Sequence, residues 1–167
     1  MTTSTSATLD AQTLRKAYGQ FPTGVVAIAA QVDGEPLGLA ASTFVPVSLD
    51  PPLVAFCIQN TSSTWPRLAG AARLGVSVLG SDHSGAARSL GSKASNRFAG
   101  LTTKTTCEGA LFIEGATAWL DTCIQETVPA GDHTIVLLQV HGLTVRAQVS
   151  PIVFHASTFW NLAATSC

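Results

Sequence analysis

Short apolar runs separated by turn residues are the feature that most limits what this chain can fold into. Such runs predict strands at residues 25–32, 53–59, 73–79, 116–126, 134–145 and 152–154. Asp33-Gly34 is typical of a hairpin turn into one more strand, and Pro129-Ala130-Gly131 predicts a loop. Many strands joined by short turns favour a mainly β fold, a closed or partly open β-barrel, over a doubly wound sheet.

Only a few helices are expected beside these strands. Asp10 can cap a first helix that runs to about Tyr18. Ser63 or Thr64 can cap a short second helix, and Asp82 a third that runs through about residue 90. The sequence therefore predicts a barrel with small helical additions.

The length of 167 residues fits one domain, which we expect over residues 10–167 after a disordered N-terminal tail at residues 1–9. Charged residues make up 11% of the chain, against roughly a quarter in an average protein, and hydrophobic residues 46%. So little surface charge indicates that part of the surface is buried in an oligomer, and a homodimer is expected.

Charge and hydropathy also exclude several function classes. A net charge of -1 with no Lys/Arg run argues against nucleic acid as a partner. No apolar run is long enough to cross a membrane as a helix, and the Ser/Thr-rich N-terminus lacks the features of a signal peptide. A cytoplasmic location is expected.

The cysteines and the missing motifs narrow the chemistry further. The four cysteines are widely spaced without a Cys-x-x-Cys pair, so we expect neither a metal site nor a disulfide. The chain has no Gly-x-Gly-x-x-Gly fingerprint and no Walker-type lysine loop. Any dinucleotide must therefore bind by another route.

Residues 38–54 combine small residues, two adjacent hydroxyls at Ser42 and Thr43, and a rigid turn at Asp50-Pro51-Pro52. Small side chains allow a ligand to approach the backbone, and hydroxyls with neighbouring N–H groups suit a phosphate. On residue types alone, an ordinary β-hairpin explains the segment equally well.

Five further segments follow in a fixed order around this one. They are FPTGV at 21–25, NTSST at 60–64, SKASNRF at 92–98, GDHTI at 131–135 and PIVFH at 151–155. Together they resemble the flavin reductase-like family over about residues 12–162. The resemblance implies an FMN-binding split β-barrel of Greek-key type and a flavin, FAD or FMN, as cofactor.

The resemblance also implies which residues hold the flavin. Hydroxyls and cations for the ribityl chain and phosphate are expected at Ser42, Thr43, Ser63, Thr64, Ser92, Lys93 and Arg97, with Phe98 packed nearby. The ring is expected against Ala40, Ala41, Cys57 and Ile58. Asn60 is assigned to the ribityl chain, and Thr23 and Asp132 complete the expected contacts.

Several of these residues have a plainer explanation. Ser63 and Thr64 could act only as helix caps, Lys93 could be a solvated lysine at a helix end, and Cys57 could serve packing alone. The family more commonly has a threonine at position 40, so Ala40 lacks a hydroxyl and any side-chain hydrogen bond there is in doubt.

By the same resemblance, His133 faces the open side of the flavin ring and positions the nicotinamide, although it could simply be a hydrogen-bonded loop histidine. The expected function is an NAD(P)H-dependent flavin reductase that supplies free reduced flavin to a separate flavin-dependent monooxygenase. NADH is favoured over NADPH because no arginine cluster is free for a 2′-phosphate. A same-fold enzyme that retains its flavin and reduces another acceptor, and a non-enzymatic flavin-binding module, remain alternatives.

Overall fold

The computed structural model describes residues 9–162, so the expected disordered tail, apart from Leu9, lies outside the described residues. The helices are α1 (Ala11–Tyr18), α2 (Trp65–Leu68) and α3 (Ser84–Leu90), with a 3-10 turn, η1 (Ser81–His83). The strands are β1 (Thr23–Gly24), β2 (Val26–Val32), β3 (Glu35–Ala41), β4 (Val45–Leu49), β5 (Pro52–Gln59), β6 (Leu74–Val78), β7 (Thr103–Thr105), β8 (Leu111–Ile113), β9 (Ala118–Ala130), β10 (His133–Val145), β11 (Ile152–His155) and β12 (Thr158–Asn161). The single domain expected over residues 10–167 stays a prediction.

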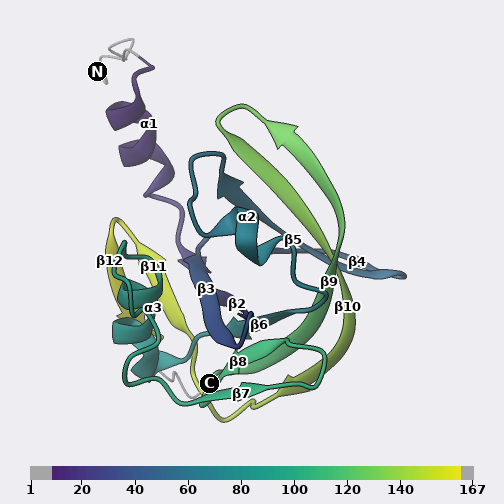
Figure 1. The fold of residues 1–167 in the computed structure, drawn as a ribbon. Helices are drawn as coiled ribbons and strands as arrows, with labels where there is room; N and C mark the ends of the chain where they lie inside the picture. The colour runs from purple at the N-terminus through teal and green to yellow at the C-terminus, as the bar shows by residue number, and fades with distance from the viewer. Residues whose placement is uncertain (1–8, 163–167) are drawn as a thin grey trace, which may run out of the picture.

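Seven strands form one antiparallel sheet in the order β3-β2-β6-β9-β10-β5-β4, which curls into a barrel (Figure 1). The β2–β3 hairpin turns at Asp33 and Gly34, whose φ angles of 52° and 80° are those of a tight hairpin. After β5 the chain crosses over, and β6 pairs with β2 rather than with β5. This return beside the first strand is a Greek-key connection, so the predicted mainly β barrel is confirmed.

The barrel is split between β3 and the β4–β5 hairpin, where a side chain replaces strand pairing. Pairing of β4 with β5 reaches only Val45 opposite Ala55. Two residues further, the Cys57 N–H donates to Thr43 Oγ1 at 2.9 Å, and that hydroxyl donates to the Cys57 carbonyl at 3.0 Å. Thr43 thus satisfies backbone groups that the strand no longer pairs.

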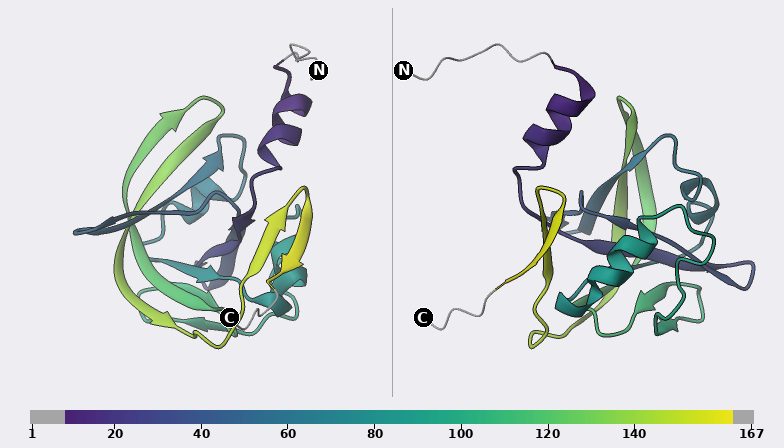
Figure 2. Two further views of the ribbon diagram at one scale, coloured as in Figure 1. Left: turned by 180° about the vertical axis from the view of Figure 1, so that it is seen from behind. Right: turned by 90° about the vertical axis from the view of Figure 1, so that its left-hand side faces the viewer.

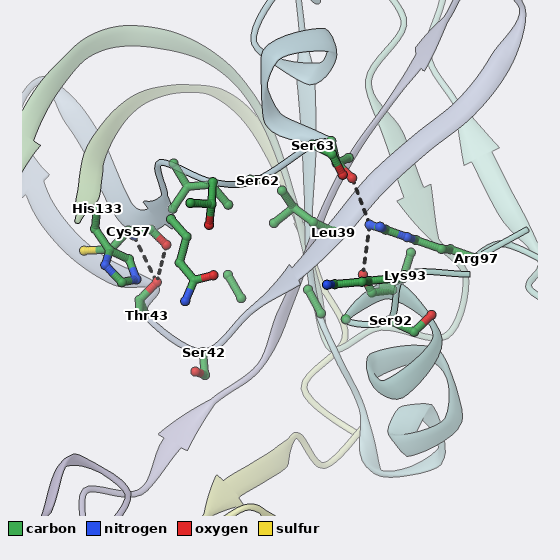
Figure 3. Close-up of a pocket in the computed structure, with 18 residues that line it drawn as sticks. Leu39, Ser42, Thr43, Cys57, Ser62, Ser63, Ser92, Lys93, Arg97 and His133 are labelled. Carbon is green, nitrogen blue, oxygen red and sulfur yellow. Dashed lines mark hydrogen bonds between the residues drawn. The ribbon is translucent and has the colours of Figure 1, made fainter. Parts of the chain in front are cut away.

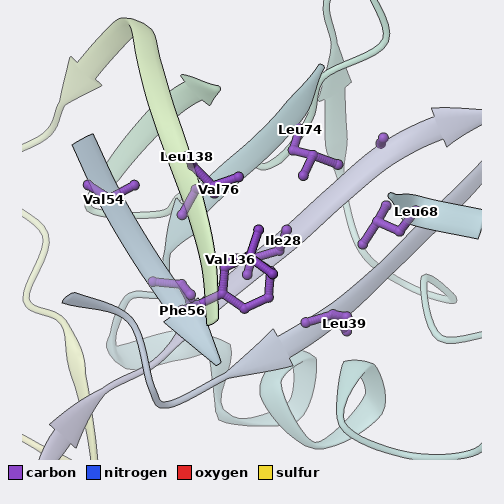
Figure 4. Packing of buried hydrophobic residues seen from close by; sticks show 11 residues of the cluster. Ile28, Leu39, Val54, Phe56, Leu68, Leu74, Val76, Val136 and Leu138 are labelled. Carbon is purple, nitrogen blue, oxygen red and sulfur yellow. The ribbon is translucent and has the colours of Figure 1, made fainter. Parts of the chain in front are cut away.

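Two apolar clusters stabilise this arrangement. One fills the barrel, with Ile28, Phe56 and Leu138 fully buried at its centre (Figure 4). The other joins the barrel to α3 and to the small sheet β1-β11-β12, through residues such as Leu90 and Phe154. The second cluster positions the loop after α3 beside the end of β3.

Helix α1 forms as predicted but does not pack as a core helix. Asp10 caps it by accepting from the Thr13 N–H at 2.8 Å, and this bond lowers the pKa of the Asp10 carboxyl. None of its residues is buried; Tyr18 at its end is 69% exposed, and Phe21 just after it is 75% exposed. Figure 2 shows the helix projecting from the barrel.

Three local predictions are wrong. Thr64 stands at the N-cap position of α2, but neither its hydroxyl nor that of Ser63 makes a capping hydrogen bond; the Trp65 N–H donates instead to Ser62 Oγ at 3.2 Å. Asp82 does not cap α3, because η1 intervenes and the ring of His83 accepts from the Gly80 N–H at 3.0 Å.

The third error is the loop predicted at residues 129–131. Pro129 and Ala130 extend β9, and the turn is confined to Gly131 and Asp132. The short strands β7, β8 and β12 were also missed, because three- and four-residue strands carry too little periodicity to be recognised.

No helix among residues 9–162 is long and apolar enough to span a membrane. Cys57, Cys107 and Cys123 are free thiols, and Cys167 lies outside the described residues. The expected cytoplasmic location stays a prediction.

Candidate functional site

A cavity of about 540 Å³ opens at the split of the barrel (Figure 3). Its walls come from the end of β3 and the segment after it, the end of β5, the loop before α2, the loop after α3, and the start of β10. The lining residues are Leu39, Ala40, Ala41, Ser42, Thr43, Cys57, Ile58, Gln59, Thr61, Ser62, Ser63, Thr64, Leu90, Gly91, Ser92, Lys93, Arg97 and His133. This volume is in the usual range for a pocket that holds an organic ligand or cofactor.

His133 and Cys57 lie at one end of this cavity. His133 lies at the start of β10 opposite Gln59, two residues along β5 from Cys57. Figure 3 shows His133 and Cys57 beside Thr43, away from the basic residues. Because the Thr43 hydroxyl donates its single proton to the Cys57 carbonyl, it cannot also donate a hydrogen bond to a phosphate.

The opposite end is cationic. The Arg97 guanidinium donates to Thr64 Oγ1 at 3.0 Å, and also reaches the backbone carbonyls of Gly38 at 3.4 Å and Leu90 at 3.5 Å. All three bonds use one nitrogen, so the other donors of the fork remain available for an anion. Lys93 is exposed at the same end, with no ion pair to any residue in 9–162.

The loop after α3 holds these cations in place. Ser92 Oγ donates to the Ser89 carbonyl at 2.7 Å and accepts from the Ala94 N–H at 3.1 Å. The Ser89 hydroxyl in turn donates to the Arg97 carbonyl at 2.8 Å. Ser92 therefore shapes the loop, and its proton is committed to that task.

The turn that carries His133 is braced by Asn60. The Asn60 amide donates to the Gly131 carbonyl at 3.2 Å and its oxygen accepts from the Thr134 hydroxyl at 2.8 Å. His133 Nδ1 contacts Asp132 Oδ1 at 2.7 Å, and this hydrogen bond, with the charge of His133, lowers the pKa of Asp132. The carboxylate fixes the tilt of the imidazole, as an orienting partner of histidine commonly does.

Most of the predicted site residues meet in this one cavity. Four of them do not line it: Thr23, Asn60, Phe98 and Asp132. Thr23 and Phe98 line neighbouring cavities, and the Thr23 hydroxyl oxygen is buried without a hydrogen-bond partner among the described residues. The Asn60 and Asp132 side chains both contact the His133 turn, and their expected flavin contacts stay predictions.

Six lining residues were missed by the sequence analysis. They are Leu39, Gln59, Thr61, Ser62, Leu90 and Gly91. Thr61 and Ser62 belong to the recognised NTSST segment and could have been included on that ground. Leu39 and Leu90 carry no such signal, because an apolar residue at a cavity wall cannot be told from a core residue by its pattern.

The residues fit a flavin mononucleotide unit. The cationic end and the Ser63 hydroxyl, which forms no hydrogen bond within residues 9–162, suit its phosphate. The small side chains of Ala40 and Ala41 leave room for a flat ring against β3. No cluster of His, Cys, Asp or Glu in the described part of the chain could hold a metal ion.

Comparisons with known proteins agree with this fit. Residues 18–163 match the family model of the flavin reductase like domain. A flavin reductase of Pseudomonas putida is 37% identical and covers 93% of this chain and 92% of its own length. The reductase subunit HsaB of a flavin-dependent monooxygenase from Mycobacterium tuberculosis is 34% identical, over 87% of this chain and 78% of its own.

Two further relatives broaden the comparison. The actinorhodin polyketide dimerase of Streptomyces coelicolor is 36% identical over 92% of this chain and 89% of its own length. The NADH:FAD oxidoreductase SgcE6 of Streptomyces globisporus, solved in complex with NAD and FAD fragments, superposes with a TM-score of 0.88 at 33% identity, covering 95% of this chain and 96% of that one. The chain therefore belongs to the flavin reductase-like family and is an NAD(P)H:flavin oxidoreductase of the split-barrel fold, as its sequence motifs predict.

Proposed function

We propose that this enzyme takes up FAD or FMN as a substrate in the cavity at the barrel split, reduces it with NADH in preference to NADPH, and releases it to a separate flavin-dependent monooxygenase. One observation carries the proposal: the cavity is polarised, with Arg97 and Lys93 at one end and His133 at the other. A flavin mononucleotide has the same polarity, with an anionic phosphate at one end and a redox-active ring at the other.

The residues of the cavity contribute alignment rather than proton transfer. A bound flavin supplies the redox chemistry, because its ring accepts a hydride directly from a nicotinamide. Arg97 and Lys93 anchor the phosphate, so the ring extends toward Cys57 and His133. His133, held by Asp132, lines the end of the cavity opposite the cations, where it would help to orient the nicotinamide.

Steady-state turnover tests this proposal directly. The purified protein is mixed with NADH or NADPH and with riboflavin, FMN or FAD, and oxidation of the pyridine nucleotide is followed by absorbance under air. We expect NADH oxidation that depends on added free flavin. No oxidation with any flavin would refute the reductase function.

A second candidate is a same-fold enzyme that retains its flavin and acts on another acceptor; one relative is named a polyketide dimerase rather than a flavin reductase. Retention distinguishes the two candidates. A flavin substrate separates from the protein on gel filtration, whereas a prosthetic flavin co-elutes with it. Tight retention without turnover would instead identify a flavin-binding module.

A homodimer is part of the proposal. Large apolar side chains stay exposed on the single chain: Tyr18, Phe21, Val45, Val47, Leu49, Leu143, Val145 and Trp160. Arg15 and Tyr18 of α1 and Phe21 just after it line a cavity of about 770 Å³, which shares Ser42 and Thr43 with the flavin cavity. A second copy would cover this surface. Sedimentation showing a fully active monomer at micromolar concentration would refute it.

A further inference from the structure

A cysteine and a histidine meet on the barrel wall, outside the flavin cavity. Cys123 belongs to β9 and His141 to β10, the two long strands that run side by side in Figure 1. Cys123 Sγ and His141 Nε2 are 3.1 Å apart, which is a hydrogen-bond distance. Neither residue lines the flavin cavity, whereas Cys57 does. The pair therefore takes no part in the flavin site described above.

The backbone of the two strands explains how these side chains come together. Thr122 is fully buried and Ile124 packs against the core inside the barrel. Because side chains alternate along a strand, Cys123 between them points to the outside. On β10 the register with β9 shifts at His141, which is an extra residue without a partner directly opposite. Such a bulge changes the direction of a side chain, and here it brings the imidazole to Cys123.

The charged groups beside the pair are compatible with a negatively charged sulfur. Asp121 lies two residues before Cys123 and so on the same face of β9. Its carboxylate would oppose a thiolate, but it pairs with Arg73 at 3.5 Å. Arg73, which directly precedes β6, also pairs with Glu108 at 3.1 Å. The nearby negative charge is thus compensated by a guanidinium from the neighbouring strand.

A thiol in contact with an imidazole can pass its proton to the ring. Cys123 then becomes a thiolate, the nucleophilic form of cysteine, beside an imidazolium that stabilises it. An ordinary thiol is only roughly a few per cent thiolate at neutral pH. Full conversion to thiolate, offset in part by its lower intrinsic nucleophilicity, makes such a sulfur about 10-fold faster to react. Cys107 is the natural comparison, because it is exposed and contacts no histidine within residues 9–162.

We propose that Cys123 is an oxidative modification site, at which His141 takes the thiol proton and hydrogen peroxide oxidises the sulfur to a sulfenic acid. The thiolate attacks one peroxide oxygen, so that an S–O bond forms and the O–O bond breaks. The departing hydroxide takes the proton from the His141 imidazolium and leaves as water. The sulfur loses two electrons, and the peroxide gains them.

The chemistry of the enzyme supplies this oxidant. Dioxygen takes two electrons and two protons from reduced flavin and becomes hydrogen peroxide, so any reduced flavin that meets dioxygen produces peroxide close to the protein. Cys123 is half-buried and His141 exposed, so a molecule as small as peroxide can reach the sulfur. The inference goes beyond the flavin reaction and uses no residue of the flavin cavity.

Trapping of the sulfenic acid tests the inference. The full chain is treated at neutral pH with limiting hydrogen peroxide and with dimedone, which labels sulfenic acids, and each cysteine peptide is quantified by mass spectrometry. The variants are His141→Asn, whose amide can form hydrogen bonds but cannot take the proton, and His155→Asn, a matched control in β11. We expect Cys123 to be labelled about 10-fold faster than Cys107 in the wild type and in His155→Asn. In His141→Asn, Cys123 should be labelled at the Cys107 rate.

The ultraviolet absorbance of the thiolate is a second measurement, which does not depend on the His141 variant keeping its fold. At neutral pH this absorbance should fall in Cys123→Ser and stay at the wild-type value in Cys107→Ser. Labelling of Cys123 no faster than Cys107 in the wild type would overturn the inference. So would fast labelling of Cys123 that persists in His141→Asn, or a thiolate absorbance that is unchanged in Cys123→Ser.

Discussion

Replacing Thr43 by valine tests the idea that one hydroxyl closes the split of the barrel. Valine has nearly the shape of threonine, so the change removes the hydroxyl and leaves the packing. It deletes both hydrogen bonds to Cys57, at 2.9 and 3.0 Å. These bonds satisfy the backbone of β5 just beyond its last pair with β4, at Val45 and Ala55.

The cost follows from the net value of a hydrogen bond. Each contributes about 0.5–1.5 kcal/mol, so two give roughly 1–3 kcal/mol. Thr43 is solvent-exposed, so water can partly replace the hydroxyl, and we expect the lower half of that range, about 1–2 kcal/mol. In a domain of this size that corresponds to a fall in Tm of roughly 2–8 °C.

Calorimetry and urea unfolding measure the effect, and Thr43→Ser is the control because it retains the hydroxyl. We expect the serine variant to stay within about 0.5 kcal/mol of the wild type. Flavin affinity should fall with Thr43→Val only through movement of Cys57 and the cavity wall. A valine variant as stable as the wild type, or a serine variant as unstable as the valine variant, would refute the bridging role.

Three further outcomes are expected. Gly75→Ala should destabilise the protein by about 3 kcal/mol in chemical unfolding, because the added Cβ would meet the backbone of Leu111. Gly85→Ala in α3 should be neutral or stabilise by about 0.5–1 kcal/mol, because the Cβ there meets nothing within 4 Å. Comparable losses of stability in the two variants would contradict this packing. His133→Ala should lower kcat/KM for NADH and leave flavin affinity nearly intact, and stopped-flow reduction at the wild-type rate would remove His133 from the site. The Asp132 carboxyl should titrate by NMR below its ordinary pKa and move back toward it in His133→Ala. Because the folded-state pKa is the lower one, the stabilisation is present above the ordinary aspartate range and is lost as the pH falls through the folded pKa. An unchanged Asp132 pKa in the variant would exclude the pair.

Local patterns were sufficient wherever one residue type dictates the backbone. Asp33-Gly34 predicted its hairpin because few residues other than glycine, asparagine and aspartate tolerate a positive φ, and both residues adopt it. Asp10 predicted the start of α1 for a similarly local reason, a carboxylate that accepts from the Thr13 N–H. The order of the motifs predicted the family and the enzyme class, and both are confirmed.

Assignments failed where several neighbouring residues offered the same chemistry. Ser62, Ser63 and Thr64 all carry hydroxyls, and the pattern could not tell that Ser62 caps α2 while Thr64 accepts from Arg97. That distinction depends on where Arg97, 33 residues further along the chain, places its guanidinium. For Asn60, which is expected at the ribityl chain, the structure adds a contact that no local pattern shows: its amide braces a turn 71 residues away.

By itself, then, the sequence determined the strand-rich barrel, the hairpin turns and the motifs of the flavin site, because strand periodicity and positive-φ residues act over a few positions. Only the tertiary structure decided which side chains are free to bind a ligand. The Thr43 and Ser92 hydroxyls donate their protons to backbone carbonyls, whereas Lys93 and Arg67 form no ion pair within residues 9–162. A hydroxyl proton that is already donated within the fold cannot also be donated to a ligand, whereas the Arg97 guanidinium has further N–H groups to offer. Which donors are committed depends on contacts that local sequence patterns do not show.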